Sequence, residues 1–414
     1  MSKINRVEVL TLLIFFLLPG LAKVLRLFDS YAGGMSIVLA IISVKYLISY
    51  KLRISNGNLN IVIICSLLLF LQYINHIFAI NDVFKTLIVS IILPIIYYIC
   101  EKFYFQICNR ENFIKTIKIV SYIIIFLIFL GIFYYERGDA FYDVGSSKYR
   151  LLIVNEPSHI PAIFGPLLIC FVFLSKNYSS IYMRLTIVSF LTLLLGTATG
   201  VILLLFLFFT IFRIHKFFLL LLFLFCMYFF ISMLNIQSID YLLDLILERV
   251  VSFFEAFNRE NYIGLNLSTI IFIQGYEFIW DTIVRLDFLG VGSGNGMFHI
   301  MDYPAFNANI YYHGDKQLNV SDPGFMLSKI ILEYGLLFGS LYLIAIYKLS
   351  KYFFLVRNRI LNYDYDHIDI IYVGCFLTTL VNCFFRGGGY IHHSMFYLFL
   401  SIIIYIYRND RKKK

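Results

Sequence analysis

Long apolar runs alternate with short polar segments along the whole chain. We predict about twelve transmembrane helices from these runs, at 7–22, 31–50, 59–79, 83–100, 117–135, 157–175, 181–196, 199–213, 217–234, 323–347, 368–385 and 392–407. A helix needs about 20 apolar residues to cross ~30 Å of hydrocarbon, and most of these runs approach that length. The pattern therefore predicts an all-α polytopic membrane protein, with residues 1–414 forming a single membrane domain.

The composition agrees with this pattern. Hydrophobic residues make up 60% of the chain and charged residues 14%, whereas soluble domains carry about 25% charged residues. The net charge of +9 comes from Lys and Arg in the short segments between runs and in the tail 408–414. Because cytoplasmic loops collect such cations, we predict cytoplasmic N- and C-termini and no nucleic-acid partner.

Two segments that this orientation places outside are unusual. Residues 136–156 are polar and rich in charge, and 235–322 form by far the longest stretch without a predicted span. Within the latter, apolar residues recur at helical spacing over 239–257, which predicts a helix lying on the membrane or capping the bundle. A second helical pattern, 270–286, contains the sole tryptophan, Trp280.

A glycine-rich run, 290–296, follows that second pattern, and a helix is not expected to continue through it. It is not interpreted as a nucleotide-binding loop, because it follows a helix and not a strand and faces outside. The interpretation that remains is a compact turn through which backbone approaches a ligand.

The stretch from Arg150 to His159 joins the outer segment 136–156 to the sixth predicted span. Pro157 suits the first turn of a helix, so Glu156 is expected at the positively polarised helix N-terminus. A carboxylate held there stays ionised and can accept a proton from a hydroxyl group. The alternative is that Glu156 only caps the helix and that Arg150 anchors the chain at lipid headgroups.

Polar residues also interrupt or begin other apolar runs. Thr197 and Thr199, between two short runs, indicate either a re-entrant hairpin or a small-residue turn that lets helices pack closely. Asp322 is expected to cap the helix of the tenth span. Glu333 lies three turns further along, where an ionisable group usually faces the protein interior, and Lys329, four positions earlier, can pair with it.

The seven cysteines and the histidines show no metal-ligand spacing. We interpret the cysteines as small packing residues. The adjacent His392 and His393 point in different directions from a helix and do not make a metal site by themselves. Neither a metal nor any other cofactor is expected.

Taken in order, these motifs resemble the O-antigen polymerase (Wzy-type) branch of the membrane O-antigen polymerase and ligase superfamily. The series begins with Arg150 and Glu156-Pro157-Ser158, continues with the Thr197-Ala198-Thr199-Gly200 turn and one dominant outer segment ending in the glycine run, and closes with Ser321-Asp322-Pro323-Gly324 followed by Glu333-Tyr334-Gly335. Ligases of this superfamily tend to have a His-Asn pair where this chain has Ser321-Asp322, which favours a polymerase.

The resemblance implies a GT-C-like helical bundle with one large helical outer loop, in the inner membrane of a bacterium and with its active site on the periplasmic face. Its substrate would be an oligosaccharide carried on undecaprenyl diphosphate. The growing glycan would leave its carrier with inversion and join an incoming lipid-linked repeat unit, without nucleotide sugar or metal. Membrane lipids are expected partners, and the sequence leaves open whether a chain-length regulator binds.

For this chemistry we predict Glu156, His159 and Asp322 as catalytic residues. Acids outnumber cations in 235–322, so a diphosphate must be bound by individual arginines in bidentate geometry. The predicted substrate-binding residues are Arg150, Arg249, Arg259, Arg386, Ser158 and Thr199. Each of these arginines has the alternative role of a headgroup anchor.

Two other functions fit a protein of this kind. One is a ligase, which would transfer finished glycan to another acceptor. The other is a flippase or transporter of lipid-linked oligosaccharide. A transporter is expected to contain two related halves, and the sequence shows no internal repeat.

Overall fold

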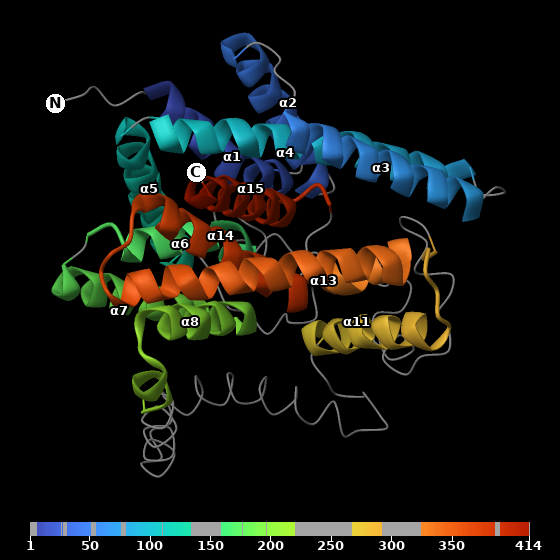
Figure 1. The fold of residues 1–414 in the computed structure, drawn as a ribbon. Coiled ribbons are helices and arrows are strands. Elements are labelled where there is room, and N and C mark those ends of the chain that lie inside the picture. Colours follow the sequence, from blue (N-terminus) through green and yellow to red (C-terminus); the bar gives the residue numbers. More distant parts are fainter. Residues whose placement is uncertain are drawn as a thin grey trace.

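In a computed structural model, the parts of the chain that are described consist of helices and the turns between them (Figure 1). The described residues are 6–25, 27, 31–50, 55–75, 80–109, 111–133, 159–175, 177–195, 197–219, 267–291, 324–385 and 390–413. No β-strand occurs among them. The all-α prediction is therefore confirmed for this part of the chain.

Five helices in the first third of the chain coincide with the first five predicted spans. They are α1 (Arg6–Val24), α2 (Tyr31–Tyr50), α3 (Asn56–Asn75), α4 (Ile80–Asn109) and α5 (Glu111–Phe133). α1 packs on α2, and α3 lies along α4 (Figure 1). Apolar residues surround each helix on every side, as is typical where one face meets protein and another meets lipid.

The later helices also follow the apolar runs within a few residues at their starts. They are α6 (His159–Val172), α7 (Tyr178–Leu195), α8 (Ala198–Ile211), α11 (Leu267–Val284), α13 (Met326–Leu361), α14 (His367–Phe384) and α15 (His393–Lys413). The helical pattern predicted over 270–286 corresponds to α11. Most of the ninth predicted span, 217–234, and the whole of 239–257 lie outside the described residues.

Six of the described helices are long and apolar enough to cross a membrane, namely α2, α4, α5, α7, α13 and α14. α6 and α8 are apolar but have 14 residues each, which makes each about 21 Å long. The molecule is thus an all-α protein with the features of a multi-pass membrane protein. A total of twelve spans stays a prediction.

α6 and α14 form the centre of the fold. Every residue of α6 after His159 is buried, and α14 packs along it. Gly165 leaves room for Thr378, because a Cβ on Gly165 would clash with the threonine hydroxyl. The Asn382 amide donates a hydrogen bond to the Ala162 carbonyl (3.3 Å). Small residues therefore allow close helix packing here, as they do in membrane bundles generally.

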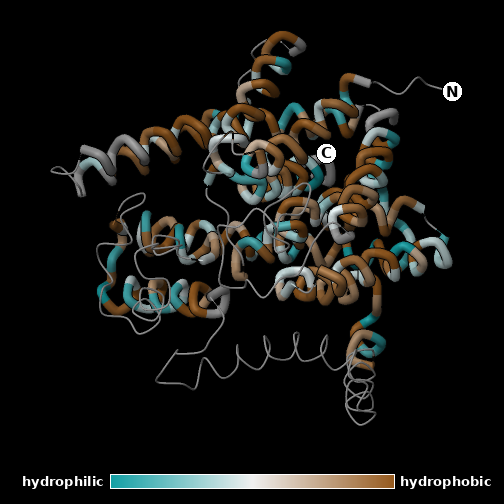
Figure 2. Tube along the Cα trace, turned by 180° about the vertical axis from the view of Figure 1, so that it is seen from behind, coloured by the Kyte–Doolittle hydropathy of each residue, from teal (hydrophilic) through white to brown (hydrophobic). Residues whose placement is uncertain are grey.

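The outward faces of the helices are apolar as well. Large hydrophobic side chains are exposed on several outlying helices, for example Phe70 on α3, Phe126 on α5 and Phe190 on α7. Figure 2 shows hydrophobic residues over the outside of these helices as well as within the bundle. Such a surface suits a hydrocarbon environment, where apolar side chains need no shielding from water.

α13 differs from the uninterrupted helix that the sequence predicts over 323–347. At Gly335 the backbone leaves the helical conformation (φ 75°, ψ −177°), so a short helix, 326–334, precedes a long one, 336–361. A Cβ on Gly339 would lie 3.6 Å from the Ile331 Cβ, although residues eight apart in a straight helix are separated by about 12 Å. The short helix therefore folds back on the long one.

Residues 285–291, which follow α11, close this reversal, and we call them the clasp. The Val291 N–H donates to a carbonyl of the short helix (2.9 Å), while the Asp287 and Phe288 carbonyls accept the first two N–H groups of the long helix (2.9 and 3.3 Å). The ends of helices leave such groups without intrahelical partners. The clasp therefore supplies hydrogen bonds to both helices at the point where α13 is broken.

Two glycines permit the close approach of clasp and helix. Gly290 (φ 73°) and Gly335 (φ 75°) have left-handed backbone angles that favour glycine. A Cβ on Gly290 would lie 2.5 Å from the Glu333 carbonyl carbon, and one on Gly335 would overlap the Phe288 carbonyl. For Gly290, the first residue of the glycine run, the backbone that comes close is thus the chain's own. The other glycines of the run lie outside the described residues.

The prediction that Asp322 caps the tenth span is wrong. The N-cap of α13 is Phe325, which makes no side-chain capping hydrogen bond. Gly324, with a left-handed φ of 81°, separates the helix from the residues before it. A Cβ on Gly324 would lie 2.6 Å from the Ile271 carbonyl oxygen of α11, so the chain turns sharply against α11 before the helix begins.

Candidate functional site

The structure describes two of the nine predicted site residues, His159 and Thr199. The other seven lie outside the described residues, namely Glu156, Asp322, Arg150, Arg249, Arg259, Arg386 and Ser158. Four of these, Glu156, Ser158, Asp322 and Arg386, lie within three positions of described segments, and those segments meet at one end of the bundle.

His159 and Thr199 belong to neighbouring first turns. His159 is half-buried as the first residue of α6, and Thr199 is buried as the second residue of α8. The two helices start side by side, since a Cβ on Gly200 would lie 3.4 Å from Pro161 Cγ. The structure thus brings these two predicted residues to the same region.

The Thr197–Gly200 turn serves helix packing. Thr197 is the N-cap of α8, and its hydroxyl oxygen accepts a hydrogen bond from the Gly200 N–H (3.3 Å). A Cβ on Gly200 would come within 2.5 Å of Thr192 Cγ2 on α7. The sequence allowed either a re-entrant hairpin or a small-residue turn. These contacts favour the turn, because the Thr197 cap and the small Gly200 let α7 and α8 pack closely.

Other chain segments converge on this region. Phe272 of α11 stacks on Phe385, just after α14, with ring centroids 6.1 Å apart, and it contacts Phe325 at 5.6 Å. Asn382 in the last turn of α14 reaches the first turn of α6. We call this region the site end. It comprises the first turns of α6 and α8, the last turn of α14 and the start of the short helix.

A buried polar group lies along the short helix. The Tyr390 phenol, just before α15, contacts Glu333 and Tyr334, and the Lys329 ammonium lies 5.4 Å from the Tyr390 ring centroid. Burial raises the pKa of Tyr390 well above its usual value, and the Glu333 carboxylate raises it further. Tyr390 therefore stays protonated and can donate a hydrogen bond. Lys329 and Glu333, which the sequence suggested as an ion pair, both meet this tyrosine.

His392 lies just before α15, and His393 is the first residue of that helix. Both contact residues of the first two helices. The Nε2 of His393 lies 2.9 Å from the Phe15 carbonyl, which can only accept, so Nε2 donates. Nδ1 lies 2.9 Å from the Tyr31 hydroxyl, within hydrogen-bond distance. The His392 ring is inclined to the His393 ring by 84°. Among the described residues, no group of three or more His, Cys, Asp or Glu side chains is arranged to hold a metal ion.

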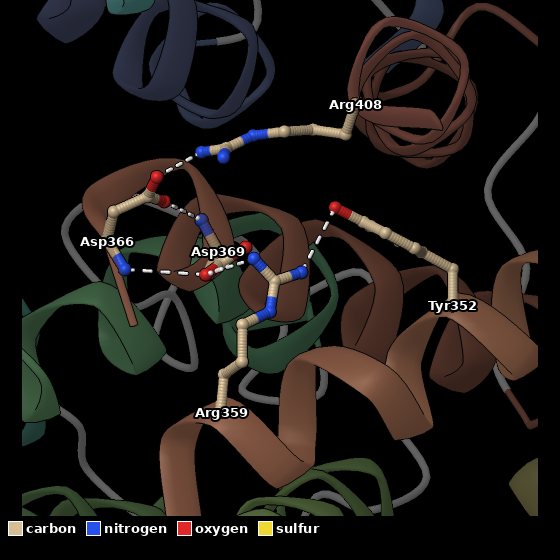
Figure 3. Close-up of polar contacts among 5 residues, drawn as sticks. All are labelled: Tyr352, Arg359, Asp366, Asp369 and Arg408. Atoms are coloured by element: carbon tan, nitrogen blue, oxygen red, sulfur yellow. Dashed lines mark hydrogen bonds and ion pairs between the residues drawn. The ribbon is translucent and has the colours of Figure 1, made fainter. Parts of the chain in front are cut away.

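A charged cluster joins α13, α14 and α15 at their other ends (Figure 3). Asp366 caps α14 by accepting from the Asp369 N–H (2.9 Å), and it forms an ion pair with Arg408 of α15. Arg359 of α13 forms an ion pair with Asp369 (3.0 Å), and its guanidinium lies 3.4 Å from the Tyr352 hydroxyl. The four charges form two ion pairs between helices, so the cluster holds the ends of α13, α14 and α15 together.

Asp366 is ionised as a result of these contacts. Burial alone would raise its pKa, but the hydrogen bond and charge of Arg408, together with the Asp369 N–H, outweigh burial and leave the pKa below its ordinary value. This cluster was not predicted from the sequence. Asp366 precedes an apolar run and Asp369 follows it by three positions, which resembles a capping box. That spacing was the feature of the sequence from which the cluster could have been predicted.

Tyr390 and Asn382 were likewise not among the predicted site residues. Asn382 is fully buried within the apolar helix α14, and a polar residue inside a predicted span was a signal that could have been used. Tyr390 carried no comparable signal, because it stands among aromatic residues that are abundant throughout this chain.

Comparison with known proteins does not extend these observations. No model of a known protein family matches the chain, and no curated protein matches it. Fold and composition define the class: the described residues are helical, and six of their helices are long and apolar enough to cross a membrane, as in a multi-pass membrane protein. Any narrower function is a proposal.

Proposed function

We propose that this protein polymerises oligosaccharide repeat units carried on undecaprenyl diphosphate, as a metal-independent, inverting membrane glycosyltransferase. The glycan would be an O antigen, a capsule or an exopolysaccharide. The reaction would transfer the growing glycan from its carrier to the incoming lipid-linked unit at the outer face of a bacterial cytoplasmic membrane.

One observation supports the proposal most directly: residues far apart in the sequence motifs border on segments that meet at the site end. Glu156, Asp322 and Arg386 stand three, two and one positions from His159, Gly324 and Phe385. The contacts of α6 with α14, and of Phe272 with Phe325 and Phe385, bring those bordering segments together. Motifs that are far apart in the sequence can serve one reaction only if they lie close together in the folded protein.

The chemistry needs few groups. The diphosphate is a good leaving group once its charge is stabilised, for which Arg150 and Arg386 are suited. A helix N-terminus also favours anions, and the short helix begins at the site end with a cap, Phe325, that lacks a polar side chain. Glu156 would take the proton of the acceptor hydroxyl as the new glycosidic bond forms and the bond to the diphosphate breaks.

The first experiment is deletion of the protein, with electrophoresis of surface glycan and analysis of lipid-linked intermediates. A polymerase predicts surface glycan limited to one repeat unit. Full-length polymer retained on its carrier would indicate a ligase instead. Repeat units trapped at the cytoplasmic face would indicate a flippase.

The second experiment tests the proposed base. Glu156→Gln should abolish chain extension while the protein stays at wild-type level in the membrane. Asp143→Asn, which removes another carboxylate from the segment 136–156, is the matched control and should retain extension. Wild-type glycan length in Glu156→Gln would remove Glu156 from the mechanism.

The third experiment separates diphosphate binding from headgroup anchoring. Arg150→Lys keeps the charge but loses the bidentate fork, so a binding role predicts loss of extension in both Arg150→Ala and Arg150→Lys. Arg137→Ala is the control within the same segment. Full activity of Arg150→Lys would assign an anchoring role. Accessibility mapping that placed 136–156 in the cytoplasm would contradict the whole proposal.

A further inference from the structure

One face of the molecule, formed by α11, the clasp and the start of the long helix, is exposed and almost wholly apolar. We call it the clasp face and define it by residues 276–291 and 336–347. Its exposed residues are Tyr276, Trp280, Ile283, Val284, Arg285, Leu286, Phe288, Leu337, Ser340, Leu341, Leu343, Ile344 and Tyr347. Only Arg285 among them is charged, a composition foreign to a surface in contact with water.

Arg285, the one charged residue among those exposed on this face, is already paired. Arg285 Nε lies 2.8 Å from Asp281 Oδ1, one turn earlier on α11. A paired guanidinium on a flexible stem can lie near hydrocarbon at lower cost than an isolated one. The clasp face thus presents no unpaired charge from Arg285 to its surroundings.

The irregular backbone of this face is hydrogen-bonded within the protein. The N–H groups of Arg285, Leu286 and Asp287 donate to carbonyls of α11, at 2.9, 3.1 and 3.1 Å. The Asp287 carboxylate accepts from the Leu289 and Gly290 N–H groups (3.1 and 2.8 Å). The Val291 N–H and the Asp287 and Phe288 carbonyls bond to α13. Non-helical backbone is tolerated at membrane depth only where it is buried in protein or lines a water-filled cavity, and the backbone of the buried Gly290 lies directly against the short helix at Glu333.

The clasp face also continues into a surface suited to lipid. Phe288 adjoins Leu337 at the start of the long helix, since the Leu337 N–H bonds to the Phe288 carbonyl. Exposed Leu341, Ile344 and Tyr347 continue this apolar surface along the same helix as far as the exposed Lys348 and Lys351, and α13 is one of the helices suited to crossing a membrane.

We propose that the clasp face is embedded in the membrane, with Trp280, Leu286 and Phe288 in contact with the acyl chains of membrane lipids. Part of the segment 235–322, which the sequence analysis placed outside as a loop, then returns into the bilayer alongside α13. The inference goes beyond the proposed function and is independent of it, because it would hold equally for a ligase or a transporter.

Trp280 is the sole tryptophan and 65% exposed, so its fluorescence reports on this face alone. The full chain is reconstituted in phosphatidylcholine vesicles whose acyl chains carry bromine at defined depths. Iodide, added to the water, is the second quencher. We expect emission at short wavelength that brominated acyl chains quench strongly and iodide does not.

Two results would overturn the proposal. Quenching by iodide without quenching by bromolipid would place the face in water. Protection from both quenchers would show that protein covers it, either a second copy of the chain or another segment. Dilution with excess lipid tells these apart, because a second copy separates on dilution.

Two variants make the result specific. In a Trp280→Phe background, Phe288→Trp moves the reporter to the clasp and should give the same pattern of quenching. In the same background, Phe126→Trp places the indole on an exposed position of α5, within the apolar stretch Ile114–Gly131. Its quenching by bromolipid sets the scale for a lipid-facing indole. Much weaker quenching of both clasp reporters than of that control would contradict the proposal.

Discussion

The contact between the clasp and α13 can be tested at Gly335. Its backbone conformation lies in a region used almost only by glycine, and strain of this kind costs of order 1–3 kcal/mol for another residue. A Cβ would also overlap the Phe288 carbonyl, and moving it away weakens two backbone hydrogen bonds to the clasp, each contributing about 1 kcal/mol. Gly335→Ala is therefore expected to destabilise the fold by about 3–5 kcal/mol.

The assay uses the protein's own thiols. Cys65, Cys100, Cys170, Cys375 and Cys383 are free and buried, so a thiol-reactive fluorophore labels them only as the protein unfolds on heating. In detergent, the melting temperature of Gly335→Ala is expected to fall by roughly 5–10 °C, given the shallow dependence for a large chain.

The control is Ser340→Ala on the same helix. Ser340 is exposed, and a surface substitution of this kind stays within about 0.5 kcal/mol. A melting temperature of Gly335→Ala equal to that of Ser340→Ala would refute the reversal of α13 at Gly335 and the clasp that closes it.

Three further outcomes can be measured with the same assay. Arg357 donates hydrogen bonds to two carbonyls at the end of α8, both at 2.7 Å, so Arg357→Ala should cost about 2–4 kcal/mol; an unchanged melting temperature would show that this cap contributes nothing. Asp366 has a lowered pKa, so its ionised form contributes stability that is full above about pH 5 and is lost as the pH falls below about 4. Asp366→Asn should lower the melting temperature at pH 7 and reduce the fall in melting temperature between pH 5 and 3. An unchanged fall in the variant would show that Asp366 does not cause it. Tyr31→Phe removes the hydroxyl that is hydrogen-bonded to His393 Nδ1 and should cost about 1 kcal/mol; a gain in stability would show that this hydrogen bond does not stabilise the fold.

Helix positions were the most predictable part of this fold. α2 begins and ends where its apolar run does, at residues 31 and 50, because uninterrupted apolar sequence between polar segments leaves little choice of conformation in a membrane. The reversal inside α13 was not predictable in the same way. Hydropathy does not report whether the chain reverses its direction, and a glycine such as Gly335 between two apolar stretches is equally compatible with a straight helix.

The candidate site was predictable only in part. The turn at Thr197 was found because two short apolar runs flank it, but its capping role depends on one hydrogen bond, to Gly200, that spacing alone does not distinguish from a re-entrant hairpin. The convergence of α6 with the end of α14 requires contacts between residues more than two hundred positions apart, such as Ala162 and Asn382. No local pattern encodes such a pair.

The position of α6 has a consequence for how the protein is made. The described part of α6 has 14 residues, and its principal neighbour, α14, is synthesised only after α7, α8, α11 and α13. At 5–20 residues per second, the intervening chain takes roughly 10–40 s to emerge from the ribosome. During that interval the groove around Gly165 and the Ala162 carbonyl has no partner from α14. A chain truncated before α14 should thus be a preferred substrate for membrane quality-control proteases, and the insertion machinery must shelter α6 until the last helices arrive.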